Sequence, residues 1–424
     1  MFNNIDEVYS WLFNQKKLAK RENLDRISKC IDMLGIKTDY KIIHIAGTNG
    51  KGSTASYIKS ILQNTGKHIG FFVSPYVVCF NERIQINDRY ISNAEIMHYC
   101  NKLYNFSNEY YKEFNDVIPF FELTFLMALL YFMDRNIDIA VIECGVGGLL
   151  DATNVLKTDL AIITNIGYDH MNTLGNSLEE IASHKLGIAK KGMTCLTACD
   201  EGIRGYFEGY QKDNNINMIY INDYVSDIVL NDYTEFKYKG ESYKASLIAS
   251  YQAFNASLAV EAAKIIDPNI PNELINYGLM NAKWPGRMET ISNNPRVILD
   301  GAHNIHGINA LVNSIKAINI SKRVKVIFSA LNDKAFDKML SILDNISDKY
   351  YFTSIMDLRA TDPNEFTKYT QKECEIIYDI EECLRTAIND TKEDELLLVT
   401  GSLHFISLMR DIYFNKIKEK WNFN

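Results

Sequence analysis

Short apolar segments alternate with longer segments in which apolar residues recur every three or four positions, through most of the chain. The short segments predict buried parallel strands at Ile42–Ala46, Ile69–Val73, Ile139–Glu143, Leu160–Thr164 and Met193–Thr197. Helical periodicity is clear over Glu95–Tyr110 and Glu122–Asp134. Strands that alternate with helices are typical of a doubly wound α/β sheet.

A second α/β pattern begins after a boundary that contains Pro285, Gly286 and Pro295. It predicts strands Val297–Leu299, Val324–Phe328 and Leu396–Val399, and helices Ile305–Ala317, Lys334–Leu343 and one at the end. We expect a first domain over 1–285, a linker over 286–296 and a smaller Rossmann-like α/β domain over 297–424. The polar, Tyr-rich segment Tyr220–Ala245 predicts a small antiparallel patch beside the main sheet.

A glycine-rich loop joins the first predicted strand to a helical segment. It comprises Gly47, Thr48, Asn49, Gly50, Lys51, Gly52 and Ser53. Backbone N–H groups and the positive end of the helix dipole bind anions at such a junction. Lys51 adds a cation, and the hydroxyl of Ser53 or Thr54 suits a magnesium ion. The loop therefore predicts a P-loop-type domain that binds ATP.

The spacing of this loop departs from the general phosphate-loop pattern. Gly47 lies too close to Gly50, and Gly52 separates Lys51 from Ser53. A simple glycine turn between strand and helix is therefore the alternative.

Polar residues follow several predicted strands, where ligands of parallel sheets bind. Glu143 ends a strand before a glycine-rich segment and suits magnesium or an activating water; a solvated strand-end glutamate is the alternative. His170 also follows a strand and suits a metal or phosphoryl group, although a lone histidine is often structural.

Other polar residues are more ambiguous. Asp151 fits either a substrate contact or a turn or N-cap residue, and Lys185, on a predicted helix, reads from composition alone as a surface lysine. Asp300 follows a strand of the second domain and suits a helix cap or a ribose hydroxyl. His303 suits a contact with a phosphoryl group.

Composition restricts the class of protein. The 424 residues are 47% hydrophobic and 23% charged, as in globular proteins, and the net charge of -8 argues against a broad nucleic-acid surface. The apolar run Leu123–Met133 is too short to span a bilayer, and the N-terminus lacks the basic region of a secretory signal. The eight cysteines include no C-x-x-C pair. We therefore expect a cytoplasmic monomer with free thiols that binds neither nucleic acid nor membranes.

With these motifs taken together, the chain resembles the folylpolyglutamate synthase/dihydrofolate synthase family, a branch of the Mur ligase superfamily. The strings that carry the resemblance, in family order over nearly the whole chain, are GTNGKGS (47–53), SP (74–75), ECGVGGLLDATN (143–154), IGYDH (166–170), HKLGI (184–188), YQAFN (251–255), PGRME (285–289), DGAHN (300–304) and TGS (400–402). The GTNGKGS, PGR and DGAHN strings favour the folate branch over the cell-wall branch.

The resemblance implies roles for individual residues. The residues implied to bind ATP are those of the loop Gly47–Ser53, together with Asn255, Arg287 and Asp300. Those implied for metal binding, with two magnesium ions, are Ser53, Ser74, Glu143, His170 and Lys185. Lys185 matches a lysine that is carbamylated in the superfamily. Those implied for the pteroate part of the substrate are Asn23, Leu24, Asp25, Arg26, Phe121, Glu122, Leu150, Asp151 and Ala152.

The implied activity is ATP-dependent transfer of L-glutamate to a folate, to dihydropteroate, or to both, through an acyl phosphate. Lys51, Lys185, His170 and His303 are the expected catalytic residues. The alternatives are a cell-wall amino-acid ligase of the same superfamily and a phosphate-loop binding protein without ligase activity.

Three positions depart from the family pattern. Tyr76 and Tyr251 each replace a histidine, and Leu149 stands where many members have arginine. None of these changes removes a magnesium or phosphate group. They leave the choice between the two folate activities open.

Overall fold

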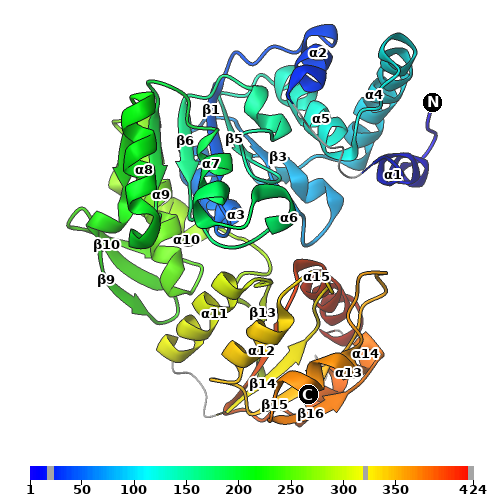
Figure 1. The fold of residues 1–424 in the computed structure, drawn as a ribbon, viewed down its shortest axis with the longest axis vertical. Helices are drawn as coiled ribbons and strands as arrows, with labels where there is room; N and C mark the ends of the chain where they lie inside the picture. The colour runs from blue at the N-terminus through cyan, green and yellow to red at the C-terminus, as the bar shows by residue number, and fades with distance from the viewer. Residues whose placement is uncertain (17–22, 319–322, 419–424) are drawn as a thin grey trace. The chain divides into compact units, whose positions relative to one another are not determined.

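The computed structural model describes residues 1–16, 23–318 and 323–418. Two compact units make up the fold (Figure 1). The first comprises Met1–Asp223 and Ser257–Leu279, and the second Tyr224–Ala256 and Met280–Asn424. This division runs through helix α9 (Ser250–Ile266). The domain boundaries expected at residues 285 and 296 stay a prediction.

The first unit is built on an eight-stranded sheet of order β4-β3-β2-β5-β1-β6-β7-β8. The strands are, in that order, Arg89–Tyr90, Ile84–Ile86, Ile69–Phe72, Ile139–Glu143, Lys41–Ala46, Leu160–Ile163, Thr194–Thr197 and Asn217–Tyr220. Neighbours from β2 to β8 are parallel, and β3 and β4 add an antiparallel edge. The predicted mostly parallel sheet is confirmed.

Helices cover both faces of this sheet (Figure 1). Those of the first unit are α1 (Ile5–Phe13), α2 (Asp25–Met33), α3 (Lys51–Gln63), α4 (Asn93–Phe114), α5 (Phe120–Asp134), α6 (Met171–Leu174), α7 (Leu178–Leu186) and α8 (Glu201–Asn214), and α10 (Asn272–Asn281) begins in it. Helix α3 packs on β1, β2 and β5 and is buried over nearly its whole length. Helix α5 is apolar on all sides and almost wholly buried, as its sequence predicts.

The second unit contains two sheets. Strands β9 (Val225–Leu230), β10 (Thr234–Tyr238) and β11 (Glu241–Ala245) form an antiparallel sheet. The predicted antiparallel patch is confirmed, but its strands form a separate sheet of the second unit. The larger sheet has the order β12 (Glu289–Asn293), β13 (Arg296–Asp300), β17 (Glu395–Thr400), β14 (Arg323–Phe328), β15 (Lys349–Phe352) and β16 (Glu373–Ile376).

Successive side chains along the strands of this larger, mostly parallel sheet point to opposite faces, and each face packs into its own hydrophobic core. Ile298 packs with α11 (Ile305–Ile318) and α12 (Phe336–Leu343), whereas Val297 packs with α14 (Ile380–Asp390) and α15 (Leu403–Ile412). The remaining short elements are α13 (Pro363–Phe366), the 3-10 turns η1 (Phe80–Arg83), η2 (Ala152–Val155), η3 (Ile221–Tyr224) and η4 (Thr367–Tyr369), and the π-turn η5 (Tyr413–Ile417). The second unit is thus the α/β layer structure expected for a Rossmann-like domain.

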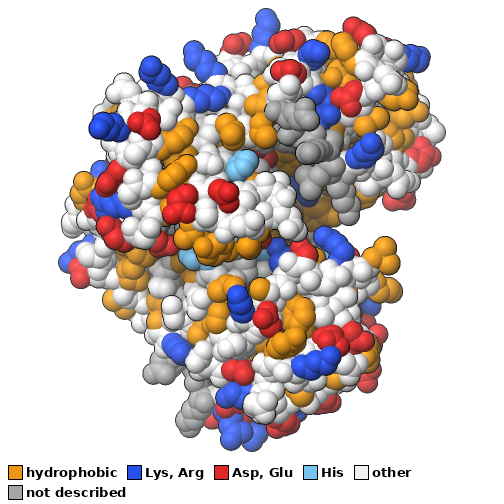
Figure 2. Space-filling view, in the orientation of Figure 1, with side chains coloured by type: hydrophobic (Ala, Val, Ile, Leu, Met, Phe, Trp, Pro, Cys, Tyr) orange, Lys and Arg blue, Asp and Glu red, His pale blue; other side chains and the backbone are white. Residues whose placement is uncertain are grey.

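Among the described residues, none of the helices combines the length and apolarity needed to cross a bilayer. On the visible face of those residues, acidic and basic side chains are interspersed (Figure 2).

Candidate functional site

The glycine-rich loop lies between the end of β1 at Ala46 and the start of α3 at Lys51. Gly47 has φ +149° and Gly50 has φ +82°, both in the region that favours glycine. A Cβ on Gly47 would overlap the hydroxyl of Thr164. The loop therefore approaches the neighbouring strand more closely than a side chain would permit.

Residues that follow β6 hold the loop in place. Asn49 donates its backbone N–H to Oδ1 of Asn165 at 2.9 Å, and Thr164 donates its hydroxyl to the Asn49 carbonyl at 2.6 Å. The Thr48 hydroxyl donates to the Gly167 carbonyl at 3.1 Å and accepts from the Gly167 N–H at 2.9 Å. Thr164 and Asn165 carry no functional signal in the sequence, because a strand-end Thr-Asn pair has no distinctive signature.

Two lysines meet at the loop. Nζ of Lys51 donates to the carbonyls of Gly47 at 3.0 Å and Thr48 at 3.2 Å, and lies 3.9 Å from Oε1 of Glu143. Nζ of Lys185 donates to the same Gly47 carbonyl at 2.9 Å. The structure thus brings Lys51, Lys185 and Glu143 together, as the family resemblance implies.

Lys185 is only 3% exposed, so the surface-lysine alternative is wrong. Burial, reinforced by the charge of Lys51, lowers the pKa of Lys185 to about 7. A substantial fraction of this amine is therefore uncharged near neutral pH.

Glu143 is buried at the end of β5, so the solvated strand-end alternative is wrong. Its Oε2 accepts the backbone N–H of Ser74 at 3.3 Å. Ser53 is buried in the first turn of α3, and His170 is exposed at the start of α6 with φ +51°. The structure links Ser74 to Glu143; it places His170 at the surface.

The donor set fits a divalent metal bound together with phosphates. In the described residues, no three His, Cys, Asp or Glu side chains gather as a complete metal cage. Magnesium normally needs only one or two protein carboxylates, with phosphate oxygens and water completing its shell. Glu143 has one carboxylate and Ser53 and Ser74 have hydroxyl oxygens, and these are ligand types that could hold magnesium.

Asp151 has a clear local role. Its side chain caps η2 by accepting the N–H of Thr153 at 3.1 Å and the Thr153 hydroxyl at 2.6 Å, and its other oxygen accepts the N–H of Val146 at 3.0 Å. The N-cap alternative is therefore confirmed. The hydroxyl of Thr153 also lies 2.7 Å from Nε2 of the buried His44. Burial lowers the pKa of that imidazole to about 3.

Several residues expected to hold the pteroate part line one cavity of about 390 Å³ in the first unit. They are Asn23, Leu24, Asp25, Arg26 and Glu122, beside Ile27, Lys29, Tyr110, Phe114 and Asp116. Arg26 donates to both oxygens of the buried Glu122, each at 2.8 Å. This fork compensates the charge of Glu122 inside the protein.

The other expected substrate residues lie elsewhere in the same unit. A Cβ on Gly145 would lie 2.8 Å from the Phe121 ring and 3.3 Å from the Asp151 carboxylate, so these groups converge on Gly145. Ala152 belongs to the apolar core, and Leu150 is half-buried. None of these residues lines the 390 Å³ cavity.

In the second unit, Asp300 is the centre of a compact polar cluster at the end of β13. Its carboxylate accepts the N–H groups of Met288 and Ala302, each at 2.9 Å, and the hydroxyl of Tyr251 at 3.4 Å. Burial raises the pKa of Asp300, while Arg287 and the N–H groups oppose that rise. Arg287 lies so close to Gly301 that a Cβ there would overlap its guanidinium.

The remaining expected residues lie near this cluster in sequence. Asn255 follows Tyr251 by one helical turn on α9 and donates to Gln252 at 3.0 Å. Nδ1 of His303 lies 2.8 Å from the Gly301 carbonyl. Tyr251, one of the departures from the family pattern, thus contacts the carboxylate that the resemblance implies for nucleotide binding.

Comparison with known proteins agrees with this arrangement. Residues 45–263 match the Mur ligase middle domain, and residues 286–403 match the Mur ligase glutamate ligase domain. The dihydrofolate synthase/folylpolyglutamate synthase of Bacillus subtilis (strain 168) is 33% identical, and the alignment covers 97% of this chain and 99% of that protein.

Solved structures share the fold over almost the whole chain. Folylpolyglutamate synthase from Thermotoga maritima has a TM-score of 0.83 at 30% identity, with 99% of each chain covered. A bifunctional folylpolyglutamate synthase/dihydrofolate synthase with Mn, AMPPNP and L-glutamate bound has a TM-score of 0.84 at 24% identity, covering 97% of this chain and 98% of that one. The chain belongs to the folylpolyglutamate synthase/dihydrofolate synthase family of the Mur ligase superfamily.

Proposed function

We propose that this protein is an ATP-dependent ligase that joins L-glutamate to a folate, to dihydropteroate, or to both. The observation that carries the proposal is the meeting of Lys51, Lys185 and Glu143 at the loop between β1 and α3. Two cations and one carboxylate at a helix N-terminus suit a nucleotide phosphate with its metal. Family membership directs this chemistry to glutamate ligation, since the relative from Bacillus subtilis bears both folate activities in its name.

The reaction requires that two anions approach each other. The substrate carboxylate attacks the γ-phosphorus of ATP, ADP leaves, and an acyl phosphate forms. We propose that Lys51 and the N–H groups of the loop contact the phosphates and so lower the repulsion between these anions. Magnesium, when bound by Glu143, Ser53 and Ser74, supplies further positive charge there.

The amine of L-glutamate then attacks the acyl carbon, and inorganic phosphate leaves with one of the carboxylate oxygens. We propose that His170 and His303 contact phosphoryl groups, and that Asn255, Arg287 and Asp300 bind nucleotide. Arg287 is a permanent cation, and Asp300 is already fixed by two backbone N–H groups. These features support a binding role, because Asp300 is fixed before a ligand arrives and Arg287 donates Nη1 to the Gly286 carbonyl at 3.1 Å.

The pteroate part is proposed to bind in the first unit, through residues 23–26, 121–122 and 150–152. The cavity lined by Arg26 and Glu122 supports the first of these segments. Lys185 is proposed to carry a carbamate and to act as a ligand of a second magnesium ion. Its burial and partly uncharged amine support that modification, because only the neutral amine reacts with carbon dioxide.

The test is release of ADP by the purified protein with magnesium, ATP and L-glutamate. Dihydropteroate, tetrahydrofolate and a uridine-linked muropeptide are supplied in separate reactions. ADP release that requires both L-glutamate and one of the two pterin substrates is expected. Turnover with the muropeptide alone would establish a cell-wall ligase instead, and ATP binding without glutamate-dependent turnover would establish a non-catalytic protein.

A further inference from the structure

Arg83 is a buried cation with an unusual environment in the first unit. It ends η1 and is 8% exposed, and its Nε is buried without a hydrogen-bond partner. Its Cζ lies 5.2 Å from the ring centroid of Tyr76, 5.5 Å from that of Phe120 and 6.0 Å from that of Phe80. Three aromatic rings therefore lie within cation–π distance of the guanidinium.

Buried arginines are normally paired with a carboxylate, because an unpaired buried charge is costly. Within residues 1–16, 23–318 and 323–418, no carboxylate lies within ion-pair distance of Arg83. The adjacent Glu82 directs Oε2 to the N–H groups of Val77 at 3.2 Å and Val78 at 2.8 Å instead. Arg83 thus has aromatic neighbours but lacks an anionic partner from this part of the chain.

Another buried cation nearby shows the ordinary arrangement. Lys59 lies 5.1 Å from the ring centroid of Phe71, donates to Gln85 at 2.9 Å and forms an ion pair with Asp88 at 3.1 Å. The aromatic contact of Lys59 is therefore accompanied by polar partners. Among the described residues, Arg83 therefore has the aromatic contacts of Lys59 without the ion pair that accompanies them there.

The position of Arg83 indicates what kind of anion would pair with it. Tyr76 follows Ser74 by two residues, and the Ser74 N–H donates to Glu143. Phe120 begins α5, next to Phe121 and Glu122 of the proposed pteroate site. Two of the rings that Arg83 contacts therefore belong to segments that also carry a proposed metal ligand, Ser74, and the proposed pterin-binding residues Phe121 and Glu122.

Arg83 remains charged at neutral pH in this environment. Burial lowers its pKa to about 10, and the negative charges of Glu143 and Glu82 oppose that lowering. A charged guanidinium binds a carboxylate through two parallel hydrogen bonds, and aromatic walls accept a flat ring.

We propose that Arg83 binds the carboxylate of the folate substrate that is to be activated, while the half-buried rings of Tyr76 and Phe120 pack against its benzoyl ring. This inference rests on the proposed function. It assigns Arg83 a substrate-binding role that fixes the attacking carboxylate near Glu143.

The test compares binding of pteroate with binding of its carboxamide, which has the same rings without the charge. Calorimetric titrations are done with magnesium and a non-hydrolysable ATP analogue present. The wild-type protein is expected to bind pteroate with about tenfold or more higher affinity than the carboxamide, because the carboxamide loses a charge-assisted pair of hydrogen bonds. Arg83→Met is expected to bind both ligands with equal affinity.

Arg83→Met also separates binding from a structural role. Replacement of an unpaired buried charge by an apolar chain of similar length is expected to keep or raise the unfolding temperature. Arg135→Gln is the matched control, since Arg135 also stacks on a ring, that of Tyr131, but is exposed and paired with Glu95. The control is expected to retain the preference for pteroate.

A folded Arg83→Met protein that prefers pteroate as strongly as the wild type would overturn the inference. Should that variant not fold, Arg83→Lys is measured, which keeps the charge without the planar fork and is expected to reduce the preference severalfold. An unchanged preference in Arg83→Lys would overturn the inference equally. Failure of the wild type to form ADP with either pterin substrate would instead refute the proposed function.

Discussion

Gly47 shows how strictly one residue is constrained at the site. Its backbone has φ +149°, and a Cβ would overlap the Thr164 hydroxyl. Thr164 in turn holds the Asn49 carbonyl. A side chain at residue 47 therefore displaces the loop from the strand that positions it.

Gly47→Ala is expected to reduce ATP affinity at least about tenfold, because preorganised N–H groups lose their geometry. Nucleotide titration measures this effect. Gly205→Ala is the control, since a Cβ at residue 205 meets open space within α8 and helix propensity favours alanine by about 1 kcal/mol. Unchanged ATP affinity in Gly47→Ala would remove the loop from the nucleotide site.

Lys185 gives a prediction about pH. Its pKa is lowered to about 7, so the neutral amine that reacts with carbon dioxide increases as pH rises from 6 to 8. Protein equilibrated with carbon-13 bicarbonate is expected to show one carbamate carbon by NMR whose intensity rises over that range. The signal is expected to be absent from Lys185→Met; a signal of equal intensity in that variant would assign the carbamate elsewhere.

Glu143→Gln tests the proposed metal ligand. The amide keeps the size of the side chain but removes the negative charge, so turnover is expected to fall by at least about 100-fold, within the usual range for a lost catalytic electrostatic contact. ADP release at several magnesium concentrations measures the loss. Glu365→Gln, an exposed carboxylate paired with Lys368, is the control and is expected to behave as the wild type. Full activity in Glu143→Gln would exclude the residue from the mechanism.

Single-residue signals in the sequence predicted part of the site. Glu143 and the glycine loop were identifiable because a carboxylate and glycines follow apolar strands. Arg83 gave no signal, since an Asn-Glu-Arg segment before a short strand is typical of exposed turns and its burial comes from tertiary packing. In the sequence Tyr251 stands out only as a departure from the family pattern, although its hydroxyl reaches Asp300.

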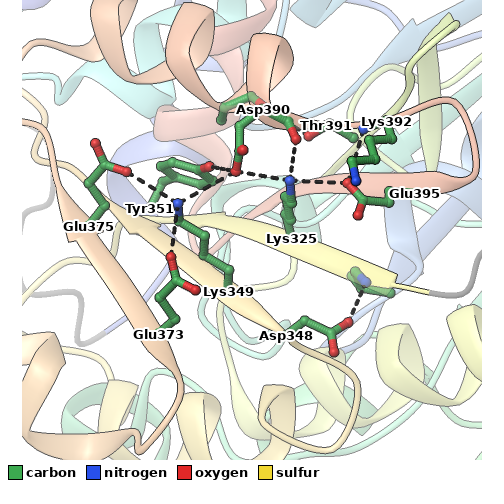
Figure 3. A network of polar contacts seen from close by, with 12 residues as sticks. Lys325, Asp348, Lys349, Tyr351, Glu373, Glu375, Asp390, Thr391, Lys392 and Glu395 are labelled. Carbon is green, nitrogen blue, oxygen red and sulfur yellow. Dashed lines mark hydrogen bonds and ion pairs between the residues drawn. The ribbon is translucent and has the colours of Figure 1, made fainter.

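At the level of elements, a polar network joins strands of the second unit at their amino ends (Figure 3). Lys325 of β14 contacts the carboxylate of Asp390 at 2.9 Å and that of Glu395, the first residue of β17, at 3.0 Å. Lys349, the first residue of β15, forms longer ion pairs with Asp390 and with Glu375. Because ligands of parallel sheets bind at carboxyl ends, this network is structural.

Lys325→Met is expected to lower the free energy of unfolding of the second unit by about 3 kcal/mol, because Glu395 is left buried without its cation. Denaturant titration, followed by circular dichroism of the backbone, measures the change in the free energy of unfolding. Lys349→Met is the control with a smaller expected effect, since two of its partners, Glu373 and Glu375, are exposed. An equal or smaller loss in Lys325→Met than in Lys349→Met would contradict this account.

Elements with strong apolar patterns were predictable from the sequence, and edge strands were not. Strands β1 and β5 of the first sheet are buried apart from Lys41, and most of their residues are apolar. Strands β4 and β16 lie at sheet edges, and their residues are mostly exposed and polar, so no apolar pattern marks them. The antiparallel patch was predictable from its composition, but its membership of the second unit depends on long-range contacts.

At the scale of the whole molecule, the family resemblance extends over the full chain, and each unit contains residues expected at the site. The first unit contains Lys51, Lys185 and Glu143 in contact with one loop, and the second contains Asp300 with Arg287 close by. The proposed activity therefore assigns roles to residues of both units.

Transfer of an oxygen atom tests the proposed ligase reaction most directly. The protein is supplied with ATP, magnesium, L-glutamate and the accepted pterin substrate, whose reacting carboxylate is labelled with oxygen-18. The account predicts one labelled oxygen in each inorganic phosphate released, because the carboxylate attacks phosphorus and the acyl phosphate later breaks at its C–O bond. Unlabelled phosphate, formed together with the glutamate conjugate, would contradict activation through an acyl phosphate.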